Sequence, residues 1–291
     1  MAGKGSQEFT PDAELSAICN KLWELDENRL EPGVDYEIDL QRYTYYGNKG
    51  NVDQARDPLF SRVDEGVLQK PTFKAFISLL DNYTSETGVS EEETSEEIKE
   101  NQIFIDRIME TKVMQHAYKV LLEKKKISGM SVRDFKHALY DLWFKLYRRT
   151  KGMEKGECDS SGFEHVFVGE TKNKEVTGFH NWIQFYLEEK RGNVDYTGWI
   201  RPRRRGKGKA VADNSAQLVT LQFKWKDTVK PVGSSFIGTS PEFEMALYTI
   251  LYFIGKNGAN QLEIEDYDVE IVVHFMGNKL GSSDPVALSQ V

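Results

Sequence analysis

Apolar residues recur at helical spacing through the first half of the chain. They repeat every three or four positions over residues 13–30, 71–80 and from about 95 to 126, so each stretch predicts a helix with one buried face. Thr94 and Ser131 are each followed three residues later by an acidic side chain, which is the spacing of a capping box. These two residues predict the start of the third helix and of a fourth helix behind it.

The pattern changes to alternation in the second half. Apolar side chains alternate with others over 166–168, 219–225 and 269–275, which predicts half-buried strands. Helical spacing returns over 181–190 and again after Ser240, where a proline and two glutamates follow in the first turn. The second half therefore mixes helices with strands.

The chain divides by pattern near residue 150, where a polar, glycine-punctuated stretch follows the helices. Residues 1–10 are expected to be a disordered or vector-derived tail. Residues 11–150 are expected to form a helical N-terminal part, and residues 151–291 an α+β part. The predicted fold class is α+β.

Composition narrows the class of protein. At 291 residues the chain can form one large domain or two modest ones, and 39% hydrophobic with 29% charged residues is ordinary for a globular protein. No apolar run approaches the ~20 residues that cross a bilayer, so we expect no membrane association. The first seven residues contain no apolar signal core. We expect a cytoplasmic or nuclear protein, or a secreted one if a signal peptide has been removed.

The net charge of −8 is unevenly distributed, and one segment is strongly basic. Residues 201–209 hold six cations, among them Arg203, Arg204 and Arg205. Two readings stay open. The segment is either a solvated loop or a surface that holds phosphates, with Trp199 beside it able to stack on a base.

Candidate chemistry centres on two histidines. His165 and His180 lie fifteen residues apart, each near a Gly-Phe pair, whereas His116 and His137 fall on predicted helices and read as surface or structural residues. Three readings of the pair stay open: structural side chains, metal ligands together with Glu164 or Glu170, or a general acid and base. His180 comes just before a helix start, where the helix dipole favours a neutral ring.

Motifs for nucleotide hydrolysis, dinucleotide binding and zinc proteolysis are absent. Several stretches instead closely resemble the EndoU family, the XendoU-like poly(U)-preferring endoribonucleases. The resemblance covers nearly the whole chain. It is carried by residues 15–40, 70–88, 135–147, 162–170, 178–187 and 232–244.

The resemblance implies an α+β catalytic domain with small antiparallel sheets, acting on single-stranded RNA. It implies transesterification that leaves a 2′,3′-cyclic phosphate and a 5′-hydroxyl. The family motif places the base on His180, the acid on His165 and a charge-stabilising cation on Lys230. It gives Glu164 and Glu170 supporting roles, either in orienting the histidines or in holding the Mn²⁺ or Ca²⁺ that animal relatives require.

The resemblance also implies a preference for uridine, for which Ser234 fits the family's base-contacting serine. Ser282 is a further candidate substrate-binding residue on the C-terminal segment. Relatives often carry a tyrosine two residues later that stacks on uracil, and here Asp284 replaces it. The alternatives are an RNA-binding protein with weak or regulated cleavage and a metal-dependent hydrolase. We expect a monomer.

Overall fold

The computed structural model describes residues 9–45, 52–201 and 213–288. Its helices follow the capping signals of the sequence, and Thr94 and Ser131 both form complete capping boxes. A 3₁₀ turn spans Val67–Gln69. The α-helices are α1 (Ala13–Glu24), α2 (Pro71–Ile77), α3 (Ser95–Met109), α4 (Lys112–Glu123), α5 (Val132–Trp143), α6 (Trp182–Lys190) and α7 (Pro241–Ile254).

Three helices are shorter than the apolar spacing predicts, among them α2, which ends at Ile77 rather than at residue 80. α1 ends at Glu24, and the side chain of Arg29 donates to the carbonyl of Trp23 at 2.6 Å, which satisfies part of the helix end. The long third helix is two helices, because Thr111 acts as a new N-cap and accepts from the amide of Met114. At Thr111 the hydroxyl bonds to the backbone and starts a new helix rather than continuing the old one.

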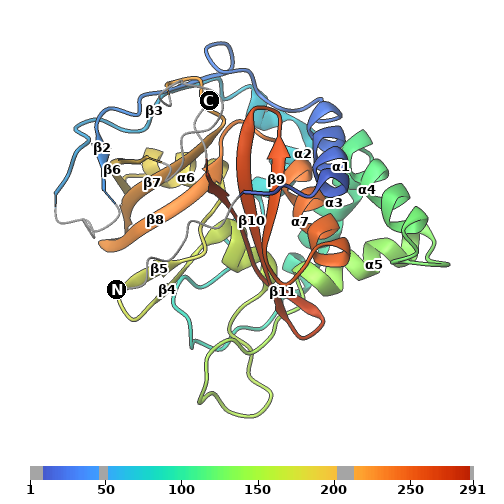
Figure 1. The fold of residues 1–291 in the computed structure, drawn as a ribbon. Coiled ribbons are helices and arrows are strands. Elements are labelled where there is room, and N and C mark those ends of the chain that lie inside the picture. Colours follow the sequence, from blue (N-terminus) through green and yellow to red (C-terminus); the bar gives the residue numbers. More distant parts are fainter. Residues whose placement is uncertain (1–8, 46–51, 202–212, 289–291) are drawn as a thin grey trace, which may run out of the picture.

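The strands form three sheets (Figure 1). β1 (Tyr36–Ile38) pairs with β3 (Phe60–Val63), and an antiparallel sheet runs β11-β10-β9. The largest sheet has the order β2-β6-β7-β8-β5-β4, with parallel pairings at β2–β6 and β5–β8. The remaining bounds are β2 (Tyr43–Thr44), β4 (Glu170–Lys172), β5 (Glu175–Thr177), β6 (Val194–Ile200), β7 (Leu218–Trp225), β8 (Thr228–Phe236), β9 (Gly258–Ile264), β10 (Tyr267–Met276) and β11 (Lys279–Ala287).

The predicted strand at 166–168 is wrong. Residues Glu164–Val168 form a π-helix, in which the amide of Gly169 donates to the carbonyl of Glu164 at 2.8 Å. All five residues of this turn are buried. A segment buried on every side has neither a helical nor an alternating polar pattern, so three residues of apparent alternation were not evidence for a strand.

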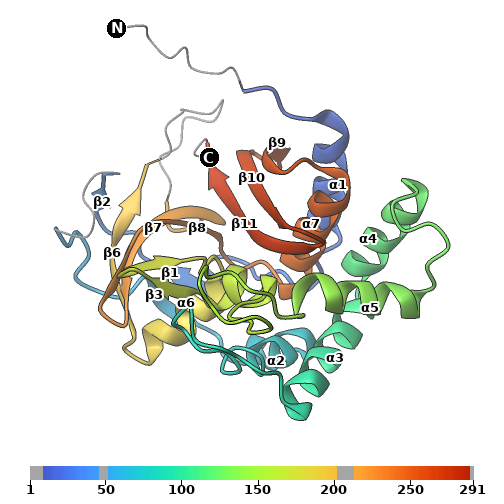
Figure 2. The same cartoon turned by 90° about the horizontal axis from the view of Figure 1, so that it is seen from below.

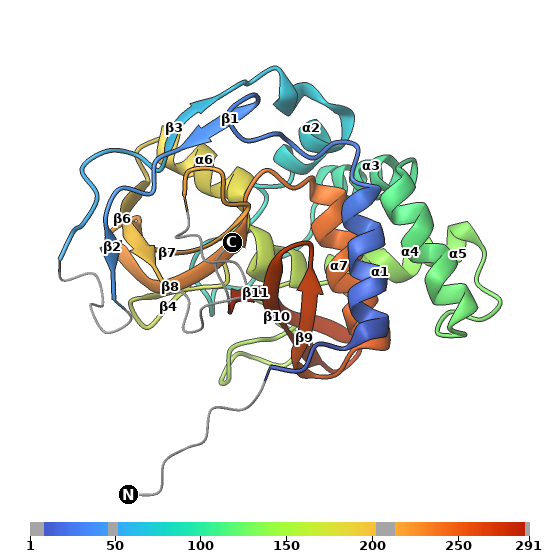
Figure 3. The ribbon, with the colours of Figure 1, turned by 45° about the horizontal axis from the view of Figure 1, so that its top comes forward.

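Helices α1, α3, α4 and α5 gather on one side of the molecule, the six-stranded sheet lies on the other, and β9–β11 lies between them (Figures 1 and 3). α7 is apolar almost all round and packs between the helices and the central sheet, against α1, α4 and β10, whereas β11 of the central sheet contacts β7 and β8. Helix α6 covers the six-stranded sheet, where Phe185 meets Phe223 with ring centroids 5.0 Å apart (Figure 2).

The α+β class is confirmed by this arrangement. The boundary near residue 150 stays a prediction, and contacts cross it in several places, such as α1 against β9 and β2 against β6. Within the described part of the chain, no helix is long and apolar enough to cross a membrane.

Candidate active site

The first histidine projects from the π-helix. The ring of His165 places Nδ1 2.5 Å from Oε2 of Glu170, the first residue of β4. Glu170 is fully buried, and Arg149 lies beside it with Nε 3.6 Å from the same oxygen. Burial lowers the pKa of His165, while the hydrogen bond and the charge of Glu170 oppose that effect. Glu170 therefore orients the ring and favours its protonated form.

The state of Glu170 follows from the same contacts. Burial acts to raise its pKa, but the hydrogen bond and charge of His165, together with Arg149, hold that pKa below its usual value. The carboxylate is thus an anion that accepts from Nδ1, so Nε2 is the nitrogen of His165 that can serve a substrate.

A tight turn carries the second histidine to the π-helix. Gly178 has φ +63°, and a Cβ there would lie 1.7 Å from the carbonyl oxygen of His165. Phe179 also has a positive φ, 64°, which a bulky residue rarely adopts. The amide of Phe179 donates to the carbonyl of His165 at 3.0 Å, and the amide of His180 donates to Val166 at 2.8 Å. These bonds fix the two histidine backbones relative to each other.

The ring of His180 is held by the neighbouring strand. Its Nδ1 lies 3.1 Å from the carbonyl oxygen of Ser234 on β8, and a carbonyl can only accept. Nδ1 is therefore the protonated nitrogen, and Nε2 keeps its lone pair. Burial, reinforced by the charge of Lys230, lowers the pKa of His180 well below the usual histidine value. The ring is a neutral base at pH 7.

Lys230 reaches the same turn from β8. Its ammonium donates to the carbonyl of Gly178 at 2.7 Å, and the residue is only 6% exposed. Burial lowers its pKa to about 8, against the opposing attraction of Asp284 and Glu175. At pH 7 Lys230 is therefore mostly charged. Its partner Gly178 lies two residues before His180 on the turn.

Of the candidate substrate-binding residues, Ser234 contacts a catalytic histidine directly, whereas Ser282 lies on a separate strand. Ser234 is 5% exposed, its hydroxyl lies 2.8 Å from that of Thr220, and its carbonyl orients His180. On β11, Ser282 and Asp284 are partly buried. Their side chains point to the same face of the strand, because residues two apart share a face. The charge of Asp284 acts on Lys230, and burial raises the pKa of Asp284 to about 6.

Glu164 makes no described hydrogen bond to either histidine. It is fully buried and accepts from the amide of Ser161 at 3.3 Å. Burial, with the neighbouring charges of Glu170 and Glu91, raises its pKa to about 10, so it is a neutral acid at pH 7. Glu164 therefore stabilises the start of the π-helix through its bond to Ser161.

A divalent ion does not fit the described residues as a protein-held cofactor. Over residues 9–45, 52–201 and 213–288, no three histidine, cysteine or acidic side chains come together as ligands. Glu170 is engaged by His165 and Arg149, and Glu164 is protonated. Metal ligation requires free, deprotonated donors.

Two supporting residues were missed by the sequence analysis. Arg149 contacts Glu170 and donates from Nε to the hydroxyl of Ser160 at 2.9 Å, and no local motif marks it. Asn181 caps α6 by accepting from the amides of Ile183 and Gln184, and its Nδ2 donates to Glu244 at 3.1 Å. An asparagine directly before a helical pattern is a typical N-cap signal, so this role was detectable.

The basic candidates Arg203, Arg204 and Arg205 lie outside the described residues. Trp199 is described, and it is only 6% exposed. Its ring is therefore not open to stack on a base, which was part of one of the two readings of the basic segment.

Together, the described side chains form an acid–base site built for an anionic substrate. Two imidazoles each have Nδ1 engaged, and their surroundings differ. Glu170 favours charge on His165 against burial, Arg149 and Lys230, whereas burial and Lys230 both oppose charge on His180. Pairs whose environments separate their pKa values suit an acid and a base. The adjacent ammonium suits a negatively charged reacting group.

Comparison with known proteins identifies the family. The family described as endoribonuclease XendoU matches residues 14–284. The chain is 48% identical over 284 residues to the poly(U)-specific endoribonuclease of Xenopus tropicalis, covering 95% of this chain and 94% of the relative. It is also 48% identical over 279 residues to the uridylate-specific endoribonuclease B of Danio rerio, covering 94% and 96%. The chain belongs to the endoribonuclease XendoU family.

A solved structure supports the same assignment. The structure of XendoU, described as a splicing-independent snoRNA-processing endoribonuclease, matches with a TM-score of 0.84 and 47% identity. The match covers 97% of this chain and 99% of that one. The EndoU resemblance seen in the sequence is thus confirmed at the level of sequence and fold.

Proposed function

We propose that this chain is a uridylate-specific endoribonuclease that cleaves single-stranded RNA by attack of a ribose 2′-hydroxyl on the adjacent phosphodiester. The observation that carries this proposal is the single hydrogen-bonded turn that unites His165, His180 and Lys230. This turn brings together three groups: the neutral imidazole of His180, the imidazole of His165 paired to a carboxylate, and the ammonium of Lys230.

In the first half of the reaction, Nε2 of His180 removes the proton of the 2′-hydroxyl. Oxygen O2′ then attacks phosphorus and forms the O2′–P bond. The Ser234 carbonyl keeps the proton of the ring on Nδ1, so the lone pair on Nε2 faces the substrate. The low pKa of His180 keeps that lone pair unprotonated at neutral pH.

In the second half, the P–O5′ bond breaks, and Nε2 of His165 donates a proton to the departing oxygen. The products are a 2′,3′-cyclic phosphate and a 5′-hydroxyl. Glu170 favours the protonated ring before transfer. A bound phosphodiester brings a further negative charge, which raises the pKa of His165 in the complex.

Lys230 stabilises the negative charge that accumulates on the phosphoryl oxygens. Its carbonyl partner at Gly178 holds the ammonium at the turn, where its charge acts on both histidines. A buried cation acts strongly here because the low dielectric weakens screening. The same burial makes the cation costly, which is why its pKa falls to about 8.

Base recognition is assigned to Ser234 and Ser282, with Asp284 beside them in place of an aromatic residue. The Mn²⁺ or Ca²⁺ expected from the family stays a prediction, and no step above uses it. Cleavage with and without a chelator tests that requirement. The cytoplasmic or nuclear location and the monomeric state likewise remain predictions.

The test is cleavage of a uridine-containing oligoribonucleotide, followed by mass analysis of the product ends. The wild type should leave cyclic phosphates, whereas His165→Ala and His180→Ala should lose about 10²–10⁴-fold in rate, the contribution typical of general acid–base groups. His137→Ala is the matched control, because His137 is exposed on α5. Undiminished cleavage by either catalytic variant overturns the assignment. Binding without cleavage by the wild type favours an RNA-binding protein instead.

A further inference from the structure

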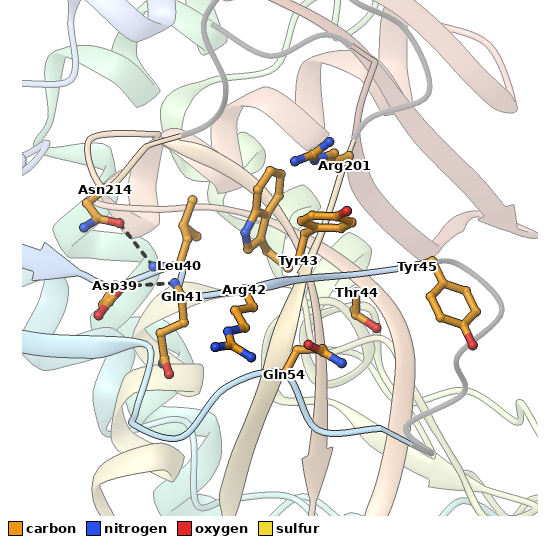
Figure 4. Close-up of a pocket in the computed structure, with 11 residues that line it drawn as sticks. Asp39, Leu40, Gln41, Arg42, Tyr43, Thr44, Tyr45, Gln54, Arg201 and Asn214 are labelled. Atoms are coloured by element: carbon orange, nitrogen blue, oxygen red, sulfur yellow. Dashed lines mark hydrogen bonds between the residues drawn. The ribbon is translucent and has the colours of Figure 1, made fainter.

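A cavity of about 580 Å³ lies at the outer edge of the six-stranded sheet, away from the two histidines. It is formed where β2 pairs with β6, and its walls come from four separate segments of the chain (Figure 4). Asp39, Tyr43, Tyr45, Gln54, Arg201 and Asn214 are among its lining residues. The proposed reaction uses none of them.

The cavity contains a stack of planar groups. The guanidinium carbon of Arg201 lies 3.9 Å from the centroid of the Tyr43 ring, and Figure 4 shows the two side by side. The edge of Trp199 supports the same ring, with centroids 6.3 Å apart and planes at 68°. Trp199 is buried, whereas Tyr43 is 53% exposed. A buried indole thus fixes an exposed phenol and guanidinium in place.

The remaining walls are polar and carry a local excess of positive charge. Arg42 adds a second exposed guanidinium, and Gln54 is a further side chain with hydrogen-bonding capacity. The carboxylate of Asp39 is already engaged, because it accepts from the amide of Gln41 at 2.9 Å.

We propose that Tyr43 and Arg201 form a secondary RNA-binding subsite. One base of the bound RNA, outside the cleaved dinucleotide, stacks there. Bases of single-stranded RNA stack on aromatic rings and on arginine planes, whatever their sequence. Arg201 attracts the phosphates next to the stacked base, and Arg42, on the opposite side of β2, adds positive charge to the same edge of the sheet (Figure 4). The ring is already fixed by Trp199, so little side-chain freedom is lost on binding.

The sheet connects this subsite to the catalytic turn. Tyr43 pairs with Trp199, Trp199 with Leu221, and Leu221 with Gly233, which directly precedes Ser234. β2 is therefore three strand spacings from β8, roughly 14 Å at the usual separation of strands. A short oligonucleotide bound at the histidines can reach it, but a dinucleotide cannot. The inference rests on the proposed ribonuclease function, since it describes how that enzyme holds its substrate.

The test separates binding from cleavage. An oligonucleotide of about twelve residues with 2′-O-methyl groups has no free 2′-hydroxyl, so its dissociation constant can be measured without cleavage. Tyr43→Ala and Arg201→Ala should each weaken its binding about fivefold or more. Tyr43→Phe should bind as the wild type does. Arg133→Ala, the same change at an exposed arginine on α5, should have no effect.

Cleavage gives the second readout. Tyr43→Ala should lower kcat/KM more for an RNA of about twelve residues than for a uridine dinucleotide. An equal loss on both substrates overturns the subsite, because the change then acts on the catalytic turn or on folding. Unchanged binding of the long probe also overturns it. If the wild type cleaves neither RNA, the proposed function fails, and the methylated probe still decides whether the subsite exists.

Discussion

The pair formed by His165 and Glu170 gives a quantitative prediction. Replacing Glu170 by glutamine keeps the shape of the side chain but removes its charge. The imidazolium of His165 then loses an anionic partner at 2.5 Å, in a site where Glu170 is fully buried and His165 is 9% exposed. Hydrogen bonds to charged groups contribute ~1.5–3 kcal/mol, and solvent screens little of that here.

The sign of the effect follows from the proton that His165 must donate. Without the carboxylate, the charged ring is less favoured, so the pKa of His165 falls further below its usual value. One pKa unit corresponds to ~1.36 kcal/mol, so the pKa should fall by roughly one to two units. At neutral pH the fraction of enzyme with a protonated His165, and with it the rate, should drop about 10- to 100-fold.

The assay is the pH dependence of kcat/KM on a uridine dinucleotide. The alkaline limb, which reports the loss of the acid, should move to lower pH by roughly one to two units in Glu170→Gln. Glu123→Gln makes the same chemical change on the exposed face of α4 and should leave the profile unchanged. An alkaline limb that stays in place in Glu170→Gln, with the fold intact by thermal unfolding, would refute the role given to this pair.

Three further predictions concern the same site. Gly178→Ala should destabilise the protein by ~2–5 kcal/mol and abolish activity, because its Cβ would overlap the carbonyl of His165; wild-type thermal stability would contradict this. Lys230→Met should be inactive, yet no less stable than the wild type at pH 7. The folded-state pKa of about 8 lies below the usual 10.5, so charge on the buried lysine opposes folding below pH 8 and ceases to do so as pH rises to 10.5. The stability difference between Lys230→Met and the wild type should therefore shrink over that range. Asp284→Tyr should tighten binding of uridine oligonucleotides by ~1–3 kcal/mol, and equal affinity would exclude base stacking at this position.

Much of the helical fold could be predicted, because its signals are local. Thr94 and Ser131 form the capping boxes that their spacing indicates, and α7 begins behind Ser240 as expected. The π-helix could not be predicted. Its five residues are buried on every side, so no polar face reveals the period of the backbone.

The candidate site was only partly accessible to sequence reasoning. His165 and His180 attract notice because histidines are few, but their spacing does not show that they meet. What unites them is backbone geometry, namely the positive φ of Gly178 and the carbonyl that accepts from Lys230 some fifty residues later. Such contacts leave no pattern along the chain, which is why Arg149 was missed altogether.

The same reasoning explains the error at Trp199. Its position beside a basic segment suggested an exposed stacking ring, but β2 pairs with β6 and covers it. That pairing joins residues more than 150 positions apart, and the short strand Tyr43–Thr44 has no alternation long enough to predict it. Tyr43, on the strand that covers Trp199, is the ring that stays exposed against it.

The central claim is that the 2′-hydroxyl of the substrate is the nucleophile, activated by His180. Two oligoribonucleotides that share one uridine and differ only in its 2′-hydroxyl test this directly, with cleavage after that residue measured by mass. The account predicts cleavage of the ribose substrate to a cyclic phosphate and no cleavage after the 2′-deoxyuridine. Cleavage after the deoxyuridine would require water as the nucleophile and would contradict the account.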